Sequence, residues 1–138
     1  MDDVLRLDAV GQAQAVKDGR VSPREPAEAA IAAIEARDGE LNAVIFRRFE
    51  RALAEIDAIP RQAPFAGVPI LLKDLGWRQA GEPYSAGSAV RDGLDGEDDY
   101  CVVRLRQAGF VLLGRTNTPE FGSTITTEPA AFGPTRNP

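Results

Sequence analysis

The sequence predicts an α/β fold in which helices come first and a βαβ unit with two parallel strands follows. Three observations support this prediction. Apolar residues recur at helical spacing through most of the first sixty positions. Two short, continuous apolar runs, Val68–Leu72 and Phe110–Leu113, are typical of strands. A helical pattern lies between these runs, and a strand–helix–strand connection of this kind places both strands parallel in one sheet.

The composition limits the class of protein. With 138 residues the chain is long enough for one domain with a core of its own. A net charge of −5 and the lack of a basic cluster argue against nucleic acid or an anionic membrane as a partner. No stretch approaches the roughly 18 apolar residues that span a bilayer, and the acidic start lacks the apolar core of a secretory signal. The single cysteine, Cys101, excludes an internal disulfide and fits a reducing, cytoplasmic location.

Residues 1–60 are predicted to form a helical scaffold that carries no chemistry. Asp8 can cap a first helix that runs to about Lys17. Residues 41–46 are expected to form a short extended segment, and residues 49–59 a third helix that a proline closes.

The second helix has the clearest start. Ser22 is the predicted cap, Pro23 takes the first helical position, and Glu25 completes a capping box. The apolar pattern then continues to about Arg37, where Asp38–Gly39 is expected to end the helix.

The first apolar run is predicted to be a strand that is buried on both faces. At its carboxyl end it delivers Lys73 and Asp74, followed closely by Gly76. Ligands gather at the carboxyl ends of strands in open α/β sheets, so a working side chain is expected here. Taken alone, however, such a pattern more often marks a solvated surface lysine beside an aspartate in a turn, because lysine is rarely fully buried.

Residues 76–98 form a long connection that is rich in Gly, Ser, Asp and Pro and has no clear periodicity. A connection of this length usually marks a functional loop or a disordered one. Within it, Ser85–Ser88 superficially resembles a serine-nucleophile turn, but the strand before such a turn and the helix after it are missing. The segment is therefore interpreted as loop packing.

The second strand is framed by two helix signals. Asp98 or Asp99 is expected to cap the helix before it, and Gly109 to end that helix. Cys101, in the first turn, is expected to be a small buried side chain. After the strand, Thr118–Glu120 is typical of the cap and first turn of a short helix.

The last segment, residues 122–138, is polar and rich in turn formers, and it reads as an unanchored loop. Two parallel strands cannot bury both faces of a sheet by themselves. We therefore expect an incomplete sheet in a single partial domain over residues 1–138, with the start of an α/β core at 61–138. A second copy of the chain, or a missing carboxyl-terminal part, is expected to cover the open apolar edge.

The chain contains no histidine. This count removes Ser-His-Asp and Cys-His catalysis and histidine-ligated zinc from the options. A general base must then be Lys, Asp, Glu or Tyr, and a serine hydrolase on this chain would need a lysine variant of the machinery. Lys73 is the candidate that this elimination brings forward.

Five stretches together resemble the amino-terminal part of an amidase signature family enzyme. They are Gly67–Asp74, Ala86–Ser88, Arg104–Phe121, Thr126–Pro129 and Gly133–Pro138. The last two are similar to the bacterial branch that contains the aminohexanoate cyclic-dimer hydrolases. The resemblance extends from about the first helix to the last residue, and the order and spacing of the motifs make it specific.

This resemblance implies a large α/β/α domain on a mixed sheet and amide hydrolysis by a Ser–cis-Ser–Lys triad. The lysine of the Gly-Val-Pro…Lys-Asp motif is catalytic in the family, which implies that Lys73 is the base. An amine that is buried at a strand end loses its solvation, so its neutral form can accept a proton. The proton reaches it through a bridging serine, and backbone N–H groups hold the oxyanion.

The sequence departs from the family pattern in one respect. Both catalytic serines and the Ser-rich signature follow the Arg-Asn-Pro motif in the family, and this sequence ends at that motif. Ser85, Ser88 and Ser123 do not match the family positions. By analogy Gly122 and Ser123 would line the acyl pocket. The 138 residues alone are therefore predicted to be inactive.

The predicted function is amide hydrolysis of a linear or cyclic carboxamide, a small molecule, by the full-length parent. Neither a metal nor an organic cofactor is expected. A glutamine amidotransferase subunit is the alternative inside the family, and the Thr-Thr-Glu-Pro ending fits it less well. The alternative that is not an enzyme is a non-catalytic fragment, or the binding half of a split assembly. Neither the particular amide nor the oligomeric state follows from the sequence.

Overall fold

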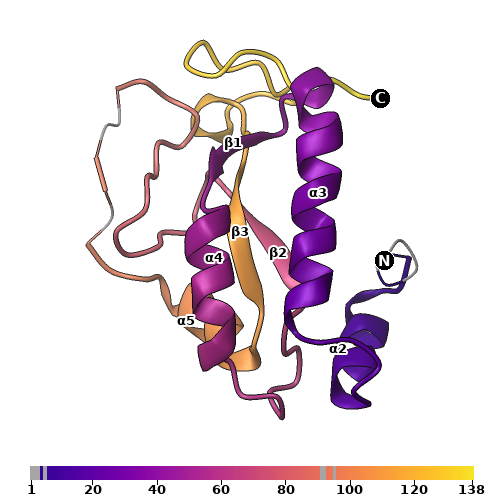
Figure 1. Cartoon of the computed structure of the whole chain (residues 1–138). Helices are drawn as coiled ribbons and strands as arrows, with labels where there is room; N and C mark the ends of the chain where they lie inside the picture. Colours follow the sequence, from indigo (N-terminus) through magenta and orange to yellow (C-terminus); the bar gives the residue numbers. More distant parts are fainter. Residues whose placement is uncertain (1–3, 5, 91–92, 95) are drawn as a thin grey trace.

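The computed structural model of the chain describes residues 4, 6–90, 93, 94 and 96–138 (Figure 1). The predictions about the acidic start and part of the long connection fall on residues 1–3, 5, 91, 92 and 95, which lie outside the described residues. In chain order the elements are α2 (Ala9–Lys17), α3 (Arg24–Leu41), β1 (Val44–Arg47), α4 (Phe49–Glu55), the 3-10 helix η1 (Ile56–Ala58), β2 (Pro69–Lys73), α5 (Tyr100–Ala108), β3 (Val111–Thr116) and the 3-10 helix η2 (Glu120–Gly122).

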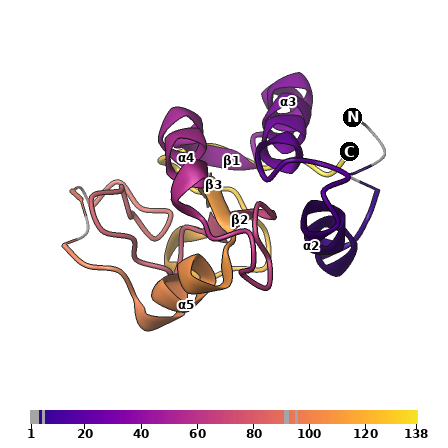
Figure 2. The same ribbon diagram turned by 60° about the horizontal axis from the view of Figure 1, so that its bottom comes forward.

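The sheet has the order β1-β3-β2, with β3 in the centre. Strands β2 and β3 are parallel, as the βαβ pattern predicts, and α5 is the crossover between them. Strand β1 pairs antiparallel with β3, so the sheet is mixed. Helices α3 and α4 lie on one side of the sheet and α5 on the other (Figure 2). The result is an α/β/α arrangement built on a small sheet.

Strand β3 carries the core on both of its faces. Val111 and Leu113 pack with α3 and α4, while Leu112, between them, packs with Leu72 and with Val102 of α5. The alternation follows from the period of two in a strand. Strand β2 differs from the prediction of burial on both faces. Only Leu72 of its residues is buried, because β2 is an edge strand of the described sheet.

Helix α3 continues past its predicted end. Asp38 and Gly39 remain helical, and Asn42 ends the helix in a left-handed conformation with φ of 52°. The Asp38 carboxylate turns inward instead and accepts hydrogen bonds from the backbone N–H groups of Ala43 (2.7 Å) and Val44 (3.0 Å). An aspartate that would favour a turn therefore anchors the start of β1.

Most other helix ends match their predicted signals. The Asp8 carboxylate accepts a hydrogen bond from the Gly11 N–H at 2.7 Å. Asp99 rather than Asp98 stands at the cap position of α5, but its carboxylate accepts from Arg78 and not from the helix. Helix α3 begins one residue later than predicted, so Pro23 and not Ser22 stands at its cap position, while the Glu25 carboxylate accepts from the Ser22 N–H at 2.6 Å. The prediction for Cys101 is wrong. Its thiol is exposed, because the buried face of α5 passes through the neighbouring Val102 instead.

The segment after β3 is anchored, contrary to the expectation of a free loop. The Thr135 hydroxyl donates to the Asn42 carbonyl at 2.7 Å, and the Asn42 side chain donates to the Phe132 carbonyl at 2.8 Å. The Phe132 ring packs edge-on against Phe46 of β1, with ring centroids 5.4 Å apart. These contacts place the last segment over the β1 end of the sheet (Figure 1).

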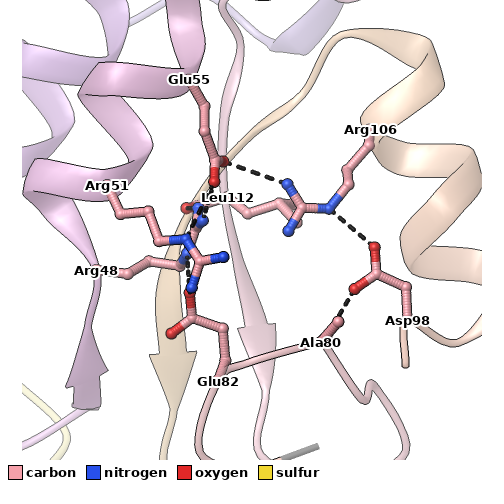
Figure 3. A network of polar contacts seen from close by, with 8 residues as sticks. All are labelled: Arg48, Arg51, Glu55, Ala80, Glu82, Asp98, Arg106 and Leu112. Carbon is pink, nitrogen blue, oxygen red and sulfur yellow. Dashed lines mark hydrogen bonds and ion pairs between the residues drawn. The ribbon is translucent and has the colours of Figure 1, made fainter. Parts of the chain in front are cut away.

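An ion-pair network joins α4, α5 and the long connection (Figure 3). Arg48, at the start of α4, donates to Glu55 at 2.6 Å and to Glu82 at 2.8 Å. It also donates to the Leu112 carbonyl of β3 at 2.6 Å. Arg106 of α5 extends the network, since it contacts Glu55 at 3.2 Å. The network ties the connection between β2 and α5 to the body of the domain.

The stability of the fold is expected to fall as the pH drops below the usual range of a glutamate. Burial alone would raise the pKa of Glu55, but the hydrogen bonds and charges of Arg48 and Arg106 outweigh it and leave the pKa below its ordinary value. The stabilisation is therefore present above about pH 4.3, the unfolded-state value, and is lost as the pH falls through the folded-state value. Denaturant unfolding, repeated at about six pH values between pH 3 and 6, measures this loss of stability. Glu55→Gln should weaken the pH dependence, and an unchanged slope would contradict the assignment.

Candidate active site

The carboxyl ends of β2 and β3 bring two polar stretches together. Lys73 is the register partner of Thr116, and the Asp74 N–H donates to the Thr116 carbonyl at 3.0 Å. The polar residues that follow each strand, Lys73–Asp74 and Asn117–Thr118, therefore lie at one edge of the sheet. The sequence placed Lys73 here, and the parallel register brings the second stretch beside it.

The Lys73 side chain is exposed, which differs from the expectation of a buried amine. Among the described residues, its amine makes no hydrogen bond or ion pair. The physical reason is the position of β2, since no strand of the described sheet lies on its outer side. The amine is positioned by its strand rather than held by a partner.

Asp74 lies in the bend after β2, as the pattern alone favours, but it is fully buried, with 0% of its surface exposed. One carboxylate oxygen accepts from the Ser85 N–H at 3.0 Å. The other accepts from the Ser85 hydroxyl at 2.5 Å and from the Gly87 N–H at 3.0 Å. A buried carboxylate with this set of donors fixes the loop around it.

The segment Ser85–Ser88 is loop packing, as interpreted from the sequence. The hydroxyl of Ser85 is committed to Asp74, and the hydroxyl of Ser88 donates to a Glu120 carboxylate oxygen at 2.5 Å. Both serines are buried. Both hydroxyls thus hold the loop to its neighbours, which agrees with the interpretation of the segment as loop packing.

Gly122 and Ser123 lie at the same edge as Lys73. A Cβ atom on Gly122 would be 2.8 Å from the Leu75 side chain, two residues beyond Lys73. The N–H of Phe121 donates to the Ala86 carbonyl at 2.8 Å, which ties this segment to the loop below it. Gly122 and Ser123 are both exposed. The structure thus brings the three residues that the sequence nominated to one edge.

The expected helix at Thr118–Glu120 is shorter and begins later. Pro119 precedes η2, and Phe121 inside it has a left-handed φ of 51°. Thr118 is not the cap because Pro119 stands at that position. Thr118 is fully buried, and its carbonyl oxygen would lie 2.7 Å from a Cβ atom on Gly87. The position of Thr118 and Glu120 after a strand was predictable, but the burial of Thr118 and the hydrogen bond from Ser88 to Glu120 were not.

A hollow of about 510 Å³ lies beside this edge, with walls that include Phe46, Tyr84 and Phe132. Ser85 and Ser88 also line it, but Lys73 does not.

The described part of the chain offers neither a metal centre nor a membrane span. No group of three or more His, Cys, Asp or Glu side chains there could hold a metal ion. None of its helices has both the length and the apolar character that a bilayer crossing demands.

The fold and this edge define a class. The chain is part of an α/β/α domain on a mixed sheet, with a lysine and an aspartate at the carboxyl end of a strand. The chain belongs to the amidase family, whose model matches residues 25–138.

Comparisons with relatives agree with this assignment. A 6-aminohexanoate-cyclic-dimer hydrolase of Paenarthrobacter ureafaciens is 48% identical over 137 residues, which are 97% of this chain and 27% of the relative. A glutamyl-tRNA(Gln) amidotransferase subunit of Mycolicibacterium gilvum is 36% identical and covers 100% of this chain with 30% of its own length. A solved structure of 6-aminohexanoate cyclic dimer hydrolase with substrate matches with a TM-score of 0.87 and 46% identity, over 95% of this chain and 27% of that one. The chain thus spans about a quarter to a third of the length of these relatives.

Proposed function

We propose that this chain supplies the lysine base of an amidase that hydrolyses a linear or cyclic carboxamide to an acid and an amine. One observation carries the proposal. Lys73 occupies the carboxyl end of β2, within the Gly-Val-Pro…Lys-Asp motif, beside the segment that holds Gly122 and Ser123. The family match and the relatives' hydrolase names support the reaction class.

The proposed mechanism begins with a proton transfer. The neutral amine of Lys73 accepts a proton through a bridging serine, and that serine accepts the proton of a second, nucleophilic serine. The nucleophile attacks the amide carbon, the amine product leaves with a proton, and water then releases the acid from the acyl-enzyme. Removing water from around Lys73 would favour its neutral form. In the proposed full-length protein, residues beyond these 138 must therefore shield the exposed Lys73 amine from water.

Neither serine of the triad is proposed to lie in this chain. Ser85 and Ser88 donate to carboxylates, and the Ser123 hydroxyl donates to the Glu120 carbonyl at 2.7 Å. We therefore propose that these 138 residues alone do not turn over an amide. Catalysis requires a nucleophile from other residues, and the relatives are more than three times as long as this chain.

The Lys73→Ala substitution is tested in the protein as its native source makes it. It is expected to lower kcat for carboxamide hydrolysis roughly 100- to 10,000-fold, the usual contribution of a general base. Ammonia or amine release from a panel of linear and cyclic amides measures it. Lys17→Ala is a matched control, because Lys17 is the other lysine of the chain and is exposed in the last turn of α2. Normal turnover by Lys73→Ala would show that Lys73 is not the base.

A second candidate function is the release of ammonia from glutamine. The match to an amidotransferase subunit over the whole of this chain supports it. Glutamine belongs in the same amide panel, and a strong preference for it over cyclic and other linear amides would favour this candidate. If the native product has an intact mass that matches the 138-residue chain and releases ammonia from no amide, a non-catalytic, binding role replaces both.

A further inference from the structure

We propose that Asp74 is a positioning residue for Lys73 and acts through Ser85 and Gly87. The proposal rests on the proposed function, since it explains how the base is held in place. Asp74, Ser85 and Gly87 together form what we call the Asp74 bracket. The bracket lies at the strand end that carries Lys73, and the proposed proton transfer does not use it.

The bracket matches a carboxylate and no neutral substitute. Asp74 is fully buried, and its two oxygens accept from two backbone N–H groups and one hydroxyl. All three partners are donors. An amide side chain has one acceptor oxygen and one NH₂ donor, so an asparagine would face at least one of these donors with a donor of its own. Burial makes such a mismatch costly.

The bracket controls Lys73 through the backbone. Asp74 lies in the bend that directly follows β2, so the contacts that fix Asp74 in the loop also fix the backbone at the end of the strand, where Lys73 lies. The Asp74 N–H also holds the strand end to the Thr116 carbonyl at 3.0 Å. The backbone at Lys73 is therefore held by two sets of contacts, those of the Asp74 carboxylate and that of the Asp74 N–H. The Lys73 amine itself has no partner among the described residues.

The loop that carries the bracket has no room to shift. Ala86 has a left-handed φ of 54°, which is rare for a residue other than glycine, and Gly87 has a φ of 73°. A Cβ atom on Gly87 would lie 2.7 Å from the Thr118 carbonyl oxygen after β3. The Ala86 carbonyl accepts from the Phe121 N–H. The bracket thus links the Lys73 end of β2 to the segment with Gly122 and Ser123.

The two lysines of the chain provide a direct test. Labelling with [¹⁵N]lysine yields two backbone amide signals, from Lys17 in α2 and Lys73 in β2. In the wild-type chain both order parameters should be near about 0.85, the value of a rigid backbone. In Asp74→Asn that of Lys73 should fall below about 0.6 while that of Lys17 stays unchanged.

Two further variants separate positioning from general stability. Ser85→Ala removes the hydroxyl donor and should lower the Lys73 order parameter by a smaller amount, while Ser85→Thr keeps a hydroxyl and should restore it. Ile56→Ala destabilises the core at a residue that lies in η1, in the cluster on the α3 and α4 side of the sheet, and is not part of the bracket. It should lower the melting temperature without a selective effect on Lys73. If Asp74→Asn unfolds the chain, the order parameters of both lysines fall together. The order parameter of Lys73 in Ser85→Ala then decides whether the bracket positions Lys73.

Kinetics of the native amidase provide the second arm. Asp74→Asn should lower kcat about 100-fold, as a misplacement of roughly 1 Å can do, with KM little changed. A wild-type protein without amide turnover overturns the proposed function, and the lysine signals still test the bracket. Turnover that depends on Lys73 but is normal in Asp74→Asn, or a Lys73 signal that stays rigid in folded Asp74→Asn, overturns the positioning role.

Discussion

Replacing Gly114 with alanine is expected to prevent the chain from forming its native sheet. Gly114 lies in the middle of β3 with a φ of 155°, where a side chain is strained. A Cβ atom at this position would lie 2.1 Å from the Phe46 carbonyl oxygen of β1, far inside van der Waals contact. The neighbour is backbone in the paired strand and cannot rotate away. The expected loss exceeds about 4 kcal/mol, the range of severe single substitutions.

Gly114 also pairs with both neighbouring strands, and it lies next to an irregularity in the β2–β3 pair. It is the partner of Arg47 in β1 and of Leu71 in β2, and the β2–β3 register shifts just before it. Moving β1 away would therefore disturb the parallel pair as well. Urea or thermal unfolding, followed by circular dichroism, measures the loss. A Gly114→Ala chain with near-normal stability would contradict the close approach of β1.

Gly39→Ala is the matched control for this substitution. Gly39 lies inside α3, has a helical φ, and a Cβ atom there would contact nothing within 4 Å. Alanine should stabilise the helix by roughly 0.5–1 kcal/mol, because glycine loses more backbone freedom on folding. The same chemical change is thus expected to have opposite signs at two sites.

Arg48→Ala is expected to cost about 3–5 kcal/mol, the usual result of removing one partner of a buried ion pair. The Arg48 side chain is 5% exposed and holds Glu55, Glu82 and the Leu112 carbonyl together. Its loss leaves the Leu112 carbonyl, next to the core, without this donor. Glu82, whose side chain is 13% exposed, also loses its most buried cation.

Arg51→Ala provides the comparison, since Arg51 contacts the same two carboxylates at 2.9 and 3.4 Å but is 53% exposed. Solvent screens such a pair, and the expected cost is below about 1 kcal/mol. Denaturant unfolding of both variants at neutral pH measures the difference. Equal costs would mean that the network of Figure 3 acts through surface charge rather than through the buried guanidinium.

The parts of the fold that depend on local chemistry were predictable. Asp8 and Gly109 act at helix ends because a cap needs only a side-chain acceptor or a left-handed residue within one turn. The parallel pairing of β2 and β3 followed from the helix between them. The family resemblance, which the family match confirms, came from motifs in a fixed order.

Errors arose where tertiary packing, or a contact beyond one helical turn, decides the outcome. Asp38 reads as a helix stop, but the N–H groups of Ala43 and Val44 take its carboxylate and the helix continues. Cys101 was expected inside α5, and the buried face passes through Val102. The last segment reads as a free loop because its anchors, among them Asn42, are about ninety residues away in the chain.

By itself, the sequence determined the class of the protein, the βαβ unit and the choice of Lys73 as the candidate base. The βαβ unit depends on residue types and spacing. The class depends on the resemblance of ordered motifs to a known family, and the choice of Lys73 depends on that resemblance together with the absence of histidine. The tertiary structure alone decided what surrounds Lys73. It placed the amine on an exposed edge and the Asp74 carboxylate in a fully buried bracket. The physical reason is that burial depends on contacts with other segments of the chain. The loop with Ser85 and Gly87 packs against the Asp74 carboxylate, whereas no strand of the described sheet lies on the outer side of β2.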